Sequence, residues 1–459
     1  MRMFDNLAAS RLVTLLAIVA VGGCSAASTN RYESLRQRAF TGVEKSSDET
    51  VVAARPGREA WAETVELSLA ALRSLAVARN PSLAAMRAAW QAAVERYPQV
   101  VALDDPQIGY SLAPATVASG STSFGQKIEV SQHFPWPGKL RLRGEAALGR
   151  VEVAGDDFED ARQHLLQSVA HTFYAYQFVH RALAINRAKQ ELLVEFRRVA
   201  EGRYAAGLAS KSDALQAEVE HQYVVHGAIV LERERAVIRA RLNTLLNLPP
   251  RDPLPPPPIE IAAPAPLPTL GVLEEAALAK RPLLRALAHS VRTSSAAVEL
   301  ARREFFPDFS VNAGYNSLWD DHDKRALVGV AINLPIQLER RRAALSETRA
   351  ELRRAEARLE QEKAKTLLQL SEAYDGLAET RHVIDLYGSS ILPAARESLA
   401  SARAGYESTA NDFLTLIATE KALYDAELTY QQALAVYHQR LARLEYAAGT
   451  PLAQLETTP

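Results

Sequence analysis

The sequence contains a single cysteine, Cys24, which excludes an internal disulfide and any zinc site built from several cysteines. It also lacks an excess of either charge, because 53 lysine and arginine residues face 54 aspartate and glutamate residues, for a formal net charge of -1. A nucleic-acid-binding protein with a basic face is therefore not expected. Aromatic residues make up only 7% of the chain. Alanine and leucine are abundant, and this composition favours a helix-rich protein over an all-β one.

Enzyme motifs are missing as well: the sequence has no nucleophile elbow, no phosphate-binding loop and no zinc-protease helix. Three histidines, His164, His171 and His180, invite a metal interpretation, but their spacing does not bring them to one helix face and no carboxylate joins them. The acidic segment 320–323 could hold a hard cation, although it fits the polar outer loop of a hairpin better. We therefore expect no enzyme, no cofactor and no resident metal ion.

The longest apolar run near the N-terminus, Leu12–Val21, is too short to span a bilayer as a helix. Arg2 and Arg11 precede it, and small residues lead from it to Cys24, as in a secretory signal. The segment resembles a bacterial lipoprotein signal, in which the cysteine is acylated, for example with palmitate, and becomes the mature N-terminus. An ordinary signal peptide with a chance cysteine is the alternative. We expect removal of residues 1–23 and lipidation of Cys24.

The sequence contains an internal repeat, in which the second half matches the first with a shift of about 200 residues. Pro135 recurs as Pro335 and Tyr204 as Tyr406, each between the same kinds of pattern. A proline-rich stretch separates the two halves and cannot be helical. The predicted segments are a signal peptide at 1–23, an extended N-terminal linker at 24–62, a first repeat at 63–248, a connector at 249–268, a second repeat at 269–452 and a tail at 453–459.

Each repeat contains two extended segments of about ten residues, the length that a tilted strand needs to cross a bilayer. Apolar and other residues alternate in them, as at Ile128, Val130, Gln132 and Phe134. The expected strands are Gln107–Ala113, Gln126–Trp136, Asp308–Ser317 and Ala326–Ile336, with the aromatic residues Phe134, Trp136, Tyr315 and Trp319 as membrane-interface anchors. Two soluble hairpins on a helical body are the alternative.

Very long helices fill the rest of each repeat. No proline occurs between Arg141 and Ala205, and apolar residues recur there at helical spacing. The matching run from Arg340 is interrupted by one proline, Pro393. A helix of this length would reach roughly 100 Å, so it must pack side by side with equally long neighbours.

The four expected strands are too few to close on themselves, and an open sheet edge in lipid leaves backbone groups unpaired at several kcal/mol each. Closure must come from other copies of the chain. Two copies would supply eight strands and three would supply twelve. Only the larger ring leaves an aqueous lumen, which favours three copies.

This arrangement resembles the outer membrane factor family, the TolC-like exit ducts of tripartite efflux pumps. The resemblance is carried by Arg203-Tyr204-Ala205-Ala206-Gly207-Leu208 with Ser210 and Asp213, and by Ala404-Gly405-Tyr406 leading to Leu423-Tyr424-Asp425-Ala426. It implies a mainly α fold with a small membrane β part, closed as a homotrimer with a twelve-stranded barrel and a periplasmic helical tunnel. Phe134-Pro135-Trp136-Pro137-Gly138-Lys139 is similar to the heavy-metal branch, which includes the cobalt-zinc-cadmium and copper/silver ducts.

The resemblance also implies partners: a periplasmic adaptor, an inner-membrane pump of the RND type, and outer-membrane lipid around the strands. The breaks near Gly207 and Thr409 would turn two helical hairpins, whose tips close the tunnel and meet the adaptor. The expected tip residues are Gly207, Leu208, Ser210, Asp213, Ser408, Thr409, Asn411 and Asp412. Serine and aspartate at these positions also fit plain helix N-caps. Thr409 departs from the turn glycine that is usual in the family.

The expected function is that of a passive outer-membrane exit duct, lipid-anchored, with a large periplasmic part and heavy-metal cations as a candidate cargo. The alternatives are an exit duct for drugs or secreted polypeptides and a periplasmic adaptor lipoprotein, although an adaptor would show one hairpin between β-rich domains. Basic residues where the strands re-enter the periplasm could contact lipid phosphate or simply be solvated: Lys139, Arg141, Arg143 and Arg340 to Arg342.

Overall fold

The structure is a computed structural model that describes residues 26–41, 66–117, 124–264, 266–319 and 324–454. The expected lipidation site Cys24 and the loop 320–323 lie outside these residues. The chain divides into two compact units: residues 1–47, 86–158 and 283–362 form unit 1, and residues 48–85, 159–282 and 363–459 form unit 2. Each unit therefore draws on both sequence repeats.

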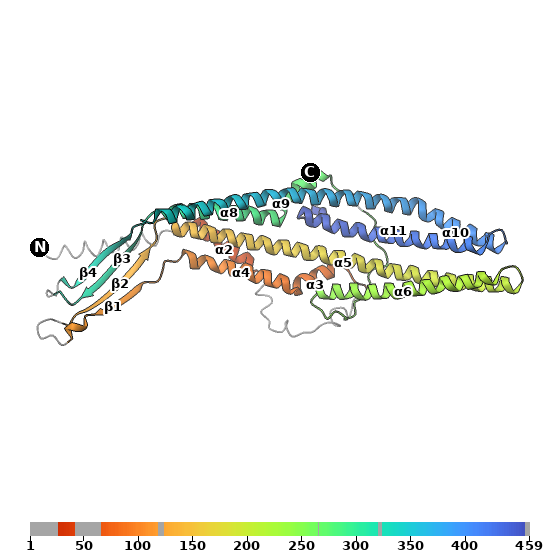
Figure 1. The fold of residues 1–459 in the computed structure, drawn as a ribbon, viewed down its shortest axis with the longest axis horizontal. Coiled ribbons are helices and arrows are strands. Elements are labelled where there is room, and N and C mark those ends of the chain that lie inside the picture. Colours follow the sequence, from red (N-terminus) through yellow and green to blue (C-terminus); the bar gives the residue numbers. More distant parts are fainter. Residues whose placement is uncertain (1–25, 42–65, 118–123, 265, 320–323, 455–459) are drawn as a thin grey trace. The chain divides into compact units, whose positions relative to one another are not determined.

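The described part of the chain is mainly helical, with one four-stranded sheet (Figure 1). The elements of unit 1 are α2 (Ala26–Phe40), most of α4 (Pro81–Val101), β1 (Gln107–Leu112), β2 (Gln126–Phe134), the start of α5 (Lys139–Ala205), α8 (Pro282–Arg303), β3 (Asp308–Asn316), β4 (Ala326–Asn333) and the start of α9 (Leu338–Leu386). Unit 2 contains α3 (Leu69–Arg79), the rest of α5, α6 (Lys211–Leu245), α7 (Leu270–Lys280), the rest of α9, α10 (Leu392–Glu407) and α11 (Phe413–Ala448). Strand and long-helix positions agree with the sequence patterns to within a few residues.

The N-terminal linker was expected to be extended over 24–62, and this is wrong for its first part, which forms helix α2. Long-range contacts within unit 1 hold this helix. Tyr32 stacks on Tyr97 with ring centroids 4.7 Å apart, and Arg31 donates two hydrogen bonds to Glu152, at 3.0 and 2.6 Å. The helix follows from these contacts, which local sequence patterns do not reveal.

Pro393 does not end the helix as its position suggested. The chain passes through a π-helical turn, Tyr387–Ile391, in which the Leu392 amide donates to the Tyr387 carbonyl, and then continues as α10. Proline has no N–H and its ring clashes with the carbonyl four residues earlier. One wider turn removes that clash and lets the helix continue.

Close helix contacts in unit 1 depend on glycines of α5. A Cβ at Gly149 would lie 2.2 Å from the Thr293 Oγ1 of α8, and one at Gly155 would lie 3.1 Å from the Trp90 ring of α4. Trp90 in turn stacks on Phe158, with centroids 5.8 Å apart. Residues of α4 and α8 therefore pack directly against the backbone of α5 at these two glycines.

Unit 2 has two apolar clusters. The first joins α7, α9 and α11 around the fully buried side chains of Leu377, Tyr437 and Leu444. The second joins α5, α6, α10 and α11 around Phe196 and Leu416. These clusters bury the apolar stripes of the long helices, and the second one lies next to the two hairpin turns.

Candidate functional site

The four strands form an antiparallel sheet in the order β1-β2-β3-β4, in which β2 and β3 join the two sequence repeats (Figure 1). The strand register places almost every apolar side chain on one face. That face consists of Ile108, Tyr110 and Leu112 of β1, Ile128, Val130 and Phe134 of β2, Phe309, Val311, Ala313 and Tyr315 of β3, and Ala326, Val328, Val330 and Ile332 of β4, with Gln126 and Gln132 as the polar exceptions. The opposite face carries Lys127, Glu129, Ser131, His133, Ser310 and Asn312.

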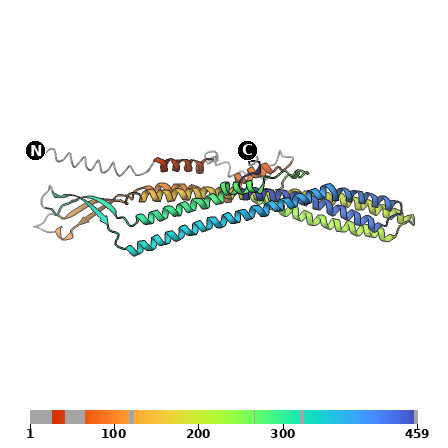
Figure 2. The ribbon, with the colours of Figure 1, turned by 90° about the horizontal axis from the view of Figure 1, so that it is seen from above.

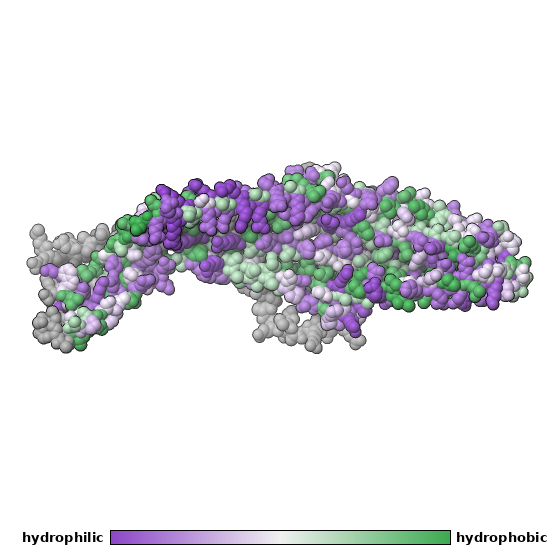
Figure 3. Space-filling view, viewed as in Figure 1, coloured by the Kyte–Doolittle hydropathy of each residue, from purple (hydrophilic) through white to green (hydrophobic). Residues whose placement is uncertain are grey.

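The apolar face is open to the surroundings, and hydrophobic residues, coloured green, lie at the surface over the strands in Figure 3. Ile108 is 77% exposed, Val328 78% and Ile332 60%. A contiguous apolar surface of this kind marks contact with lipid or another protein. The nine residues of β2 span about 30 Å, close to the thickness of a bilayer's hydrocarbon core. Among the helices that the structure describes, none is both long enough and apolar enough for a membrane span.

Both outer strands of the sheet have a free side. Within the described residues, β1 pairs only with β2, and β4 pairs only with β3. Each therefore presents a row of backbone N–H and C=O groups that no other described strand pairs. An edge of this kind in lipid would cost several kcal/mol per group.

Where the strands lead into helices, a buried lysine ties the two repeats together. Lys139, which is 1% exposed, donates from Nζ to Asp308 Oδ1 at 2.9 Å and to Glu304 Oε2 at 3.2 Å. Asp308 Oδ1 also accepts from the Trp136 amide at 2.7 Å. Lys139 is thus engaged inside the protein, and neither of the two roles considered for it, contact with lipid phosphate or plain solvation, fits its burial.

Two of the predicted interface anchors form aromatic stacks at this junction. Phe134 stacks on Phe309 at 5.5 Å between centroids, and Trp136 stacks on Phe306 at 5.3 Å. The other two anchors, Tyr315 and Trp319, lie toward the opposite end of the strands and are 41% and 45% exposed. The aromatic side chains therefore lie near both ends of the sheet.

The second candidate site is the pair of hairpin turns in unit 2, α5–α6 and α10–α11, which lie next to each other (Figures 1 and 2). Gly207 and Thr409 both have positive φ, +73° and +66°. Ser210 caps α6 by accepting from the Ser212 amide at 3.1 Å, and Asp412 caps α11 by accepting from the Thr415 amide at 2.9 Å. Both caps satisfy free N–H groups at helix starts.

Cross-hairpin contacts hold the two turns together. Arg203 donates to the Glu407 carbonyl at 2.8 Å, and its guanidinium lies 4.7 Å from the centre of the Tyr406 ring. The Tyr406 hydroxyl donates to Asp213 Oδ2 at 3.3 Å. Burial, and then the neighbouring Asp213 carboxylate, raise the pKa of Tyr406. These contacts link the first hairpin to the second.

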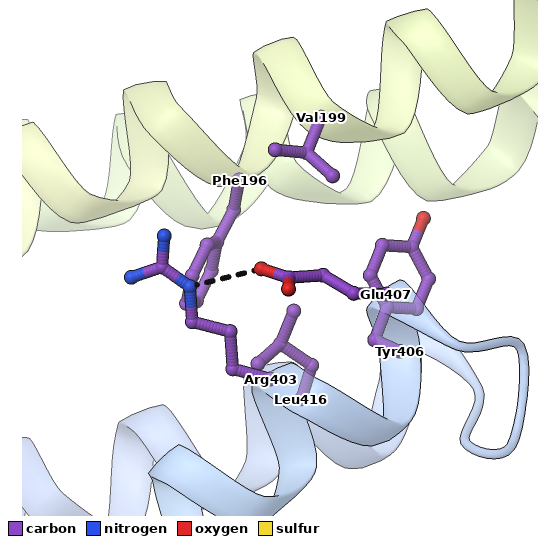
Figure 4. Close-up of a pocket in the computed structure, with 6 residues that line it drawn as sticks. All are labelled: Phe196, Val199, Arg403, Tyr406, Glu407 and Leu416. Carbon is purple, nitrogen blue, oxygen red and sulfur yellow. Dashed lines mark hydrogen bonds and ion pairs between the residues drawn. The ribbon is translucent and has the colours of Figure 1, made fainter.

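A small pocket lies beneath these contacts (Figure 4). Its six lining residues come from α5, α10 and α11: Phe196, Val199, Arg403, Tyr406, Glu407 and Leu416. Arg403 bonds to Glu407 on its own helix at 3.2 Å and to Glu195 of α5 at 2.5 Å. The pocket is part of the packing between the hairpins and has no set of converging catalytic groups.

The expected tip residues therefore play different structural roles. Gly207 and Thr409 make the turns, Ser210 and Asp412 cap helices, and Asp213 holds Tyr406. Ser408 donates to the Gly405 carbonyl at 3.2 Å, and the Asn411 amide donates to that same carbonyl at 3.1 Å. Leu208 stands out because it is apolar and 61% exposed at a turn.

Sequence reasoning missed a buried charged layer in unit 2. Lys189 of α5 and Glu420 of α11 lie 3.0 Å apart, with side chains only 7% and 5% exposed. The Lys189 ammonium lies 4.2 Å from the centre of the Tyr424 ring, and the fully buried Asn186 donates to the Tyr424 hydroxyl at 3.3 Å. The partners are more than 200 residues apart in the chain, so no local pattern pointed to them.

The histidines singled out in the sequence do not converge. Among the described residues, no group of three or more histidine, cysteine, aspartate or glutamate side chains could hold a metal ion. Burial, and then the Arg235 and Arg187 charges, lower the pKa of His180 to about 4. Burial, and then Arg241, lower the pKa of His171. Both imidazoles are therefore neutral near pH 7.

Comparison with known proteins gives consistent matches. A family model described as outer membrane efflux protein matches residues 72–248 and 273–450. The cobalt-zinc-cadmium resistance protein CzcC of Cupriavidus metallidurans is 22% identical over 395 residues, which cover 83% of this chain and 90% of that protein.

Solved structures of outer-membrane channels share the fold. CusC matches with a TM-score of 0.71 at 19% identity, over 84% of this chain and 93% of that one. The MtrE channel of Neisseria gonorrhoeae, in its open state, matches with a TM-score of 0.69 at 19% identity, over 84% and 89% of the two chains. The channel OprN gives 0.69 at 21% identity, over 83% and 89%.

These matches confirm the resemblance that the sequence carries, the mainly helical fold with a small sheet, the outer-membrane location with a large periplasmic part, and the role in efflux. The two matched ranges together cover well over half of the sequence, one in each half. The chain belongs to the outer membrane efflux protein family.

Proposed function

We propose that three copies of this chain close their sheets into one twelve-stranded barrel and extend it as a helical tunnel, which conducts metal cations out of the periplasm. The observation that carries the proposal is the sheet, with one apolar face, one polar face and two free edges. The apolar face fits lipid, the polar face fits a water-filled lumen, and the edges fit the neighbouring copies.

The duplication supports a specific register between copies. Within the chain, β2 meets β3 with Phe134 opposite Phe309. In the other repeat, Phe134 corresponds to Leu334, just after β4, and Phe309 corresponds to Ile108, near the start of β1. The join between copies therefore pairs Leu334 with Ile108, Ile332 with Tyr110 and Val330 with Leu112 of the next copy, which keeps apolar side chains on one face.

The helices support neighbouring copies as well. Helix α6 carries an exposed apolar stripe at heptad-like spacing: Leu215 (57% exposed), Val219 (50%), Tyr223 (67%), Val230 (42%) and Val237 (40%). These residues fall within one quarter of the helix circumference and within one unit of the chain. A stripe of this kind is the seam that a coiled-coil partner covers.

Cysteine cross-linking of the lipid-embedded protein tests this assembly. The double variant I332C/Y110C is expected to form disulfides between copies, seen as dimers and trimers on a gel that vanish with reductant. The matched control I332C/I108C is shifted by two residues and should cross-link far less. A purified protein that light scattering shows to be monomeric contradicts the proposal, as does efficient cross-linking of the shifted pair alone.

The metal cargo rests on two observations. CzcC is named for resistance to cobalt, zinc and cadmium, and the segment Phe134–Lys139 resembles the heavy-metal branch. Deletion of the gene is expected to sensitise cells to one or more of cobalt, zinc, cadmium and copper. Sensitivity to drugs alone would assign the duct to drug efflux, and a secretion defect alone would assign it to polypeptides.

The tips of the two hairpins would meet the periplasmic adaptor, and through it an inner-membrane pump of the RND type. Leu208 is the most accessible apolar side chain of the expected tip set, at 61% exposed. L208D should weaken co-purification of the adaptor with the trimer while leaving the trimer intact. S212A, on the neighbouring helix start, is the matched control. Equal binding by L208D and the parent protein would remove Leu208 from the contact surface.

Lipidation at Cys24 completes the proposed arrangement. Helix α2 starts at Ala26, and Arg31 and Tyr32 fix it to unit 1. An acyl chain on Cys24 would thus be tethered by a short segment to a firmly held helix. C24S should abolish incorporation of labelled palmitate, and persistent labelling of C24S would contradict the assignment.

The proposed repeat boundaries, 63–248 and 269–452, enclose both ranges matched by the family model.

A further inference from the structure

Few charges lie on the strands. The sequences of β1 and β4 contain none, and β2 and β3 together contain Lys127, Glu129 and Asp308. All three belong to the polar face. Asp308 is neutralised by the buried Lys139 at 2.9 Å. Among the charged residues within the strands, Lys127 and Glu129 are therefore the two that lie outside the Asp308–Lys139 pair.

These two side chains form an ion pair along β2. The Lys127 ammonium contacts Glu129 Oε2, and the side chains remain 44% and 29% exposed. The other carboxylate oxygen, Oε1, accepts a hydrogen bond from Asn312 Nδ2 of β3 at 2.8 Å. Glu129 is thus held in place by a cation that remains partly in contact with solvent.

Glycines clear the space around Glu129. Its partners across the sheet are Gly109 of β1 and Gly314 of β3. A Cβ at Gly314 would lie 2.7 Å from the Ile128 carbonyl oxygen and 3.5 Å from the Glu129 Cβ. Since no side chain lies directly opposite Glu129 on either neighbouring strand, its carboxylate, which Asn312 contacts from one side, stays partly exposed on the polar face.

We propose that Lys127 and Glu129 act as a charge-compensated pair in the strand section, where Glu129 attracts inorganic cations and Lys127 cancels that attraction. This rests on the proposed function, because it requires the polar face to line the duct. The compensated pair lets cations pass without holding them. Removal of either member leaves one fixed charge per copy, and the two removals must act in opposite directions.

The test uses S131C, which places a thiol on the same face two residues from Glu129, in the full-length protein in whole cells. Reaction rates are measured with methanethiosulfonates of similar size that carry either an ammonium or a sulfonate group. Relative to S131C alone, K127Q should raise the ratio of cationic to anionic rates on the order of fivefold in ~0.01 M salt, and E129Q should lower it by a similar factor. The double variant K127Q/E129Q and the charge-conserving K127R should both match S131C alone.

A thiol on the opposite face separates this inference from the proposed function. V130C should resist both reagents, because it faces lipid. Labelling of V130C in place of S131C would overturn the duct geometry and the inference with it. Labelling of S131C with rate ratios that do not change in K127Q and E129Q, or that change in the same direction in both, overturns the inference alone.

Discussion

Replacement of Glu420 by leucine removes one partner of a buried ion pair and leaves the other in place. Lys189 is then left without its counter-ion at a site where its side chain is only 7% exposed. A buried charge without a counter-ion is strongly destabilising, by about 3–5 kcal/mol in comparable cases. The Tyr424 ring, 4.2 Å from the Lys189 ammonium, retains about 1–2 kcal/mol of cation–π attraction. The expected loss for E420L is therefore about 1–4 kcal/mol.

The double variant K189M/E420L gives the opposite expectation. Both charges disappear together, and two apolar side chains of similar size enter a layer that lies between two apolar clusters. Replacements of this kind are neutral or stabilising by about 1–4 kcal/mol. The double variant should thus be at least as stable as the parent protein, although E420L alone is much less stable.

Thermal unfolding of the detergent-solubilised full chain, followed by circular dichroism at fixed protein concentration, measures these differences. The matched control is E427Q, seven residues further along α11, which removes the exposed Arg396–Glu427 pair, 3.4 Å apart and also formed between two helices. It should cost less than about 1 kcal/mol. The reasoning is refuted if E420L is as stable as E427Q, or if K189M/E420L is as unstable as E420L.

Three further changes test other parts of the structure. T409G should stabilise the α10–α11 turn by about 1 kcal/mol, because a β-branched residue at φ +66° is strained there; a lower melting temperature would count against it. G149A should destabilise the protein by about 1–3 kcal/mol, because its Cβ would lie 2.2 Å from Thr293 Oγ1. G202A on the same helix has open space around its Cβ and should be neutral or slightly stabilising. Equal effects in the two variants would contradict the close approach. The pKa of His180 is lowered to about 4, so its neutral form contributes fully to the free energy of unfolding above pH 6.5. This stability is lost as pH falls from 6.5 toward 4, by up to about 2–3 kcal/mol after solvent screening. H180L should flatten the stability curve in that window, and an unchanged slope would show that another group titrates.

The periodic elements were accessible from sequence because their patterns are local. Alternation through Ile128 and Val130 predicted β2 to within two residues, and the proline-free run from Arg141 predicted α5 to within two residues of its start. The α2 helix was not accessible, because its stabilising partners Tyr97 and Glu152 lie far along the chain. Pro393 indicated the right place for a break but not the π-turn that absorbs it.

The candidate sites were accessible only in part. The turns at Gly207 and Thr409 and the caps at Ser210 and Asp412 follow from residue chemistry and were located correctly in the chain. The cross-hairpin contacts of Arg203 were not foreseen, because they depend on how two repeats pack. The same holds for the pair of Lys189 and Glu420, whose side chains also come from different repeats. These side-chain contacts depend on how the two repeats pack together, which a sequence pattern within one repeat does not determine.

The sheet shows such a pairing between repeats in its centre, whereas each of its two outer edges is unpaired within the described residues. Where β2 meets β3, the two repeats are joined within one chain, and Lys139 lies buried between Glu304 and Asp308. In the proposed trimer, the free sides of β1 and β4 would form the corresponding junction between copies. Exposed acidic residues, Asp104 and Asp105, precede β1, and the exposed Arg340 follows β4. Since exposed charges of opposite sign stand on the two sides, although Glu339 occupies the position that corresponds to Lys139, we expect an acidic and a basic partner to meet between neighbouring copies. D104K/D105K should then weaken the trimer, and R340D in the same chain should partly restore it. No recovery in the triple variant would show that the outer edges meet by strand pairing alone.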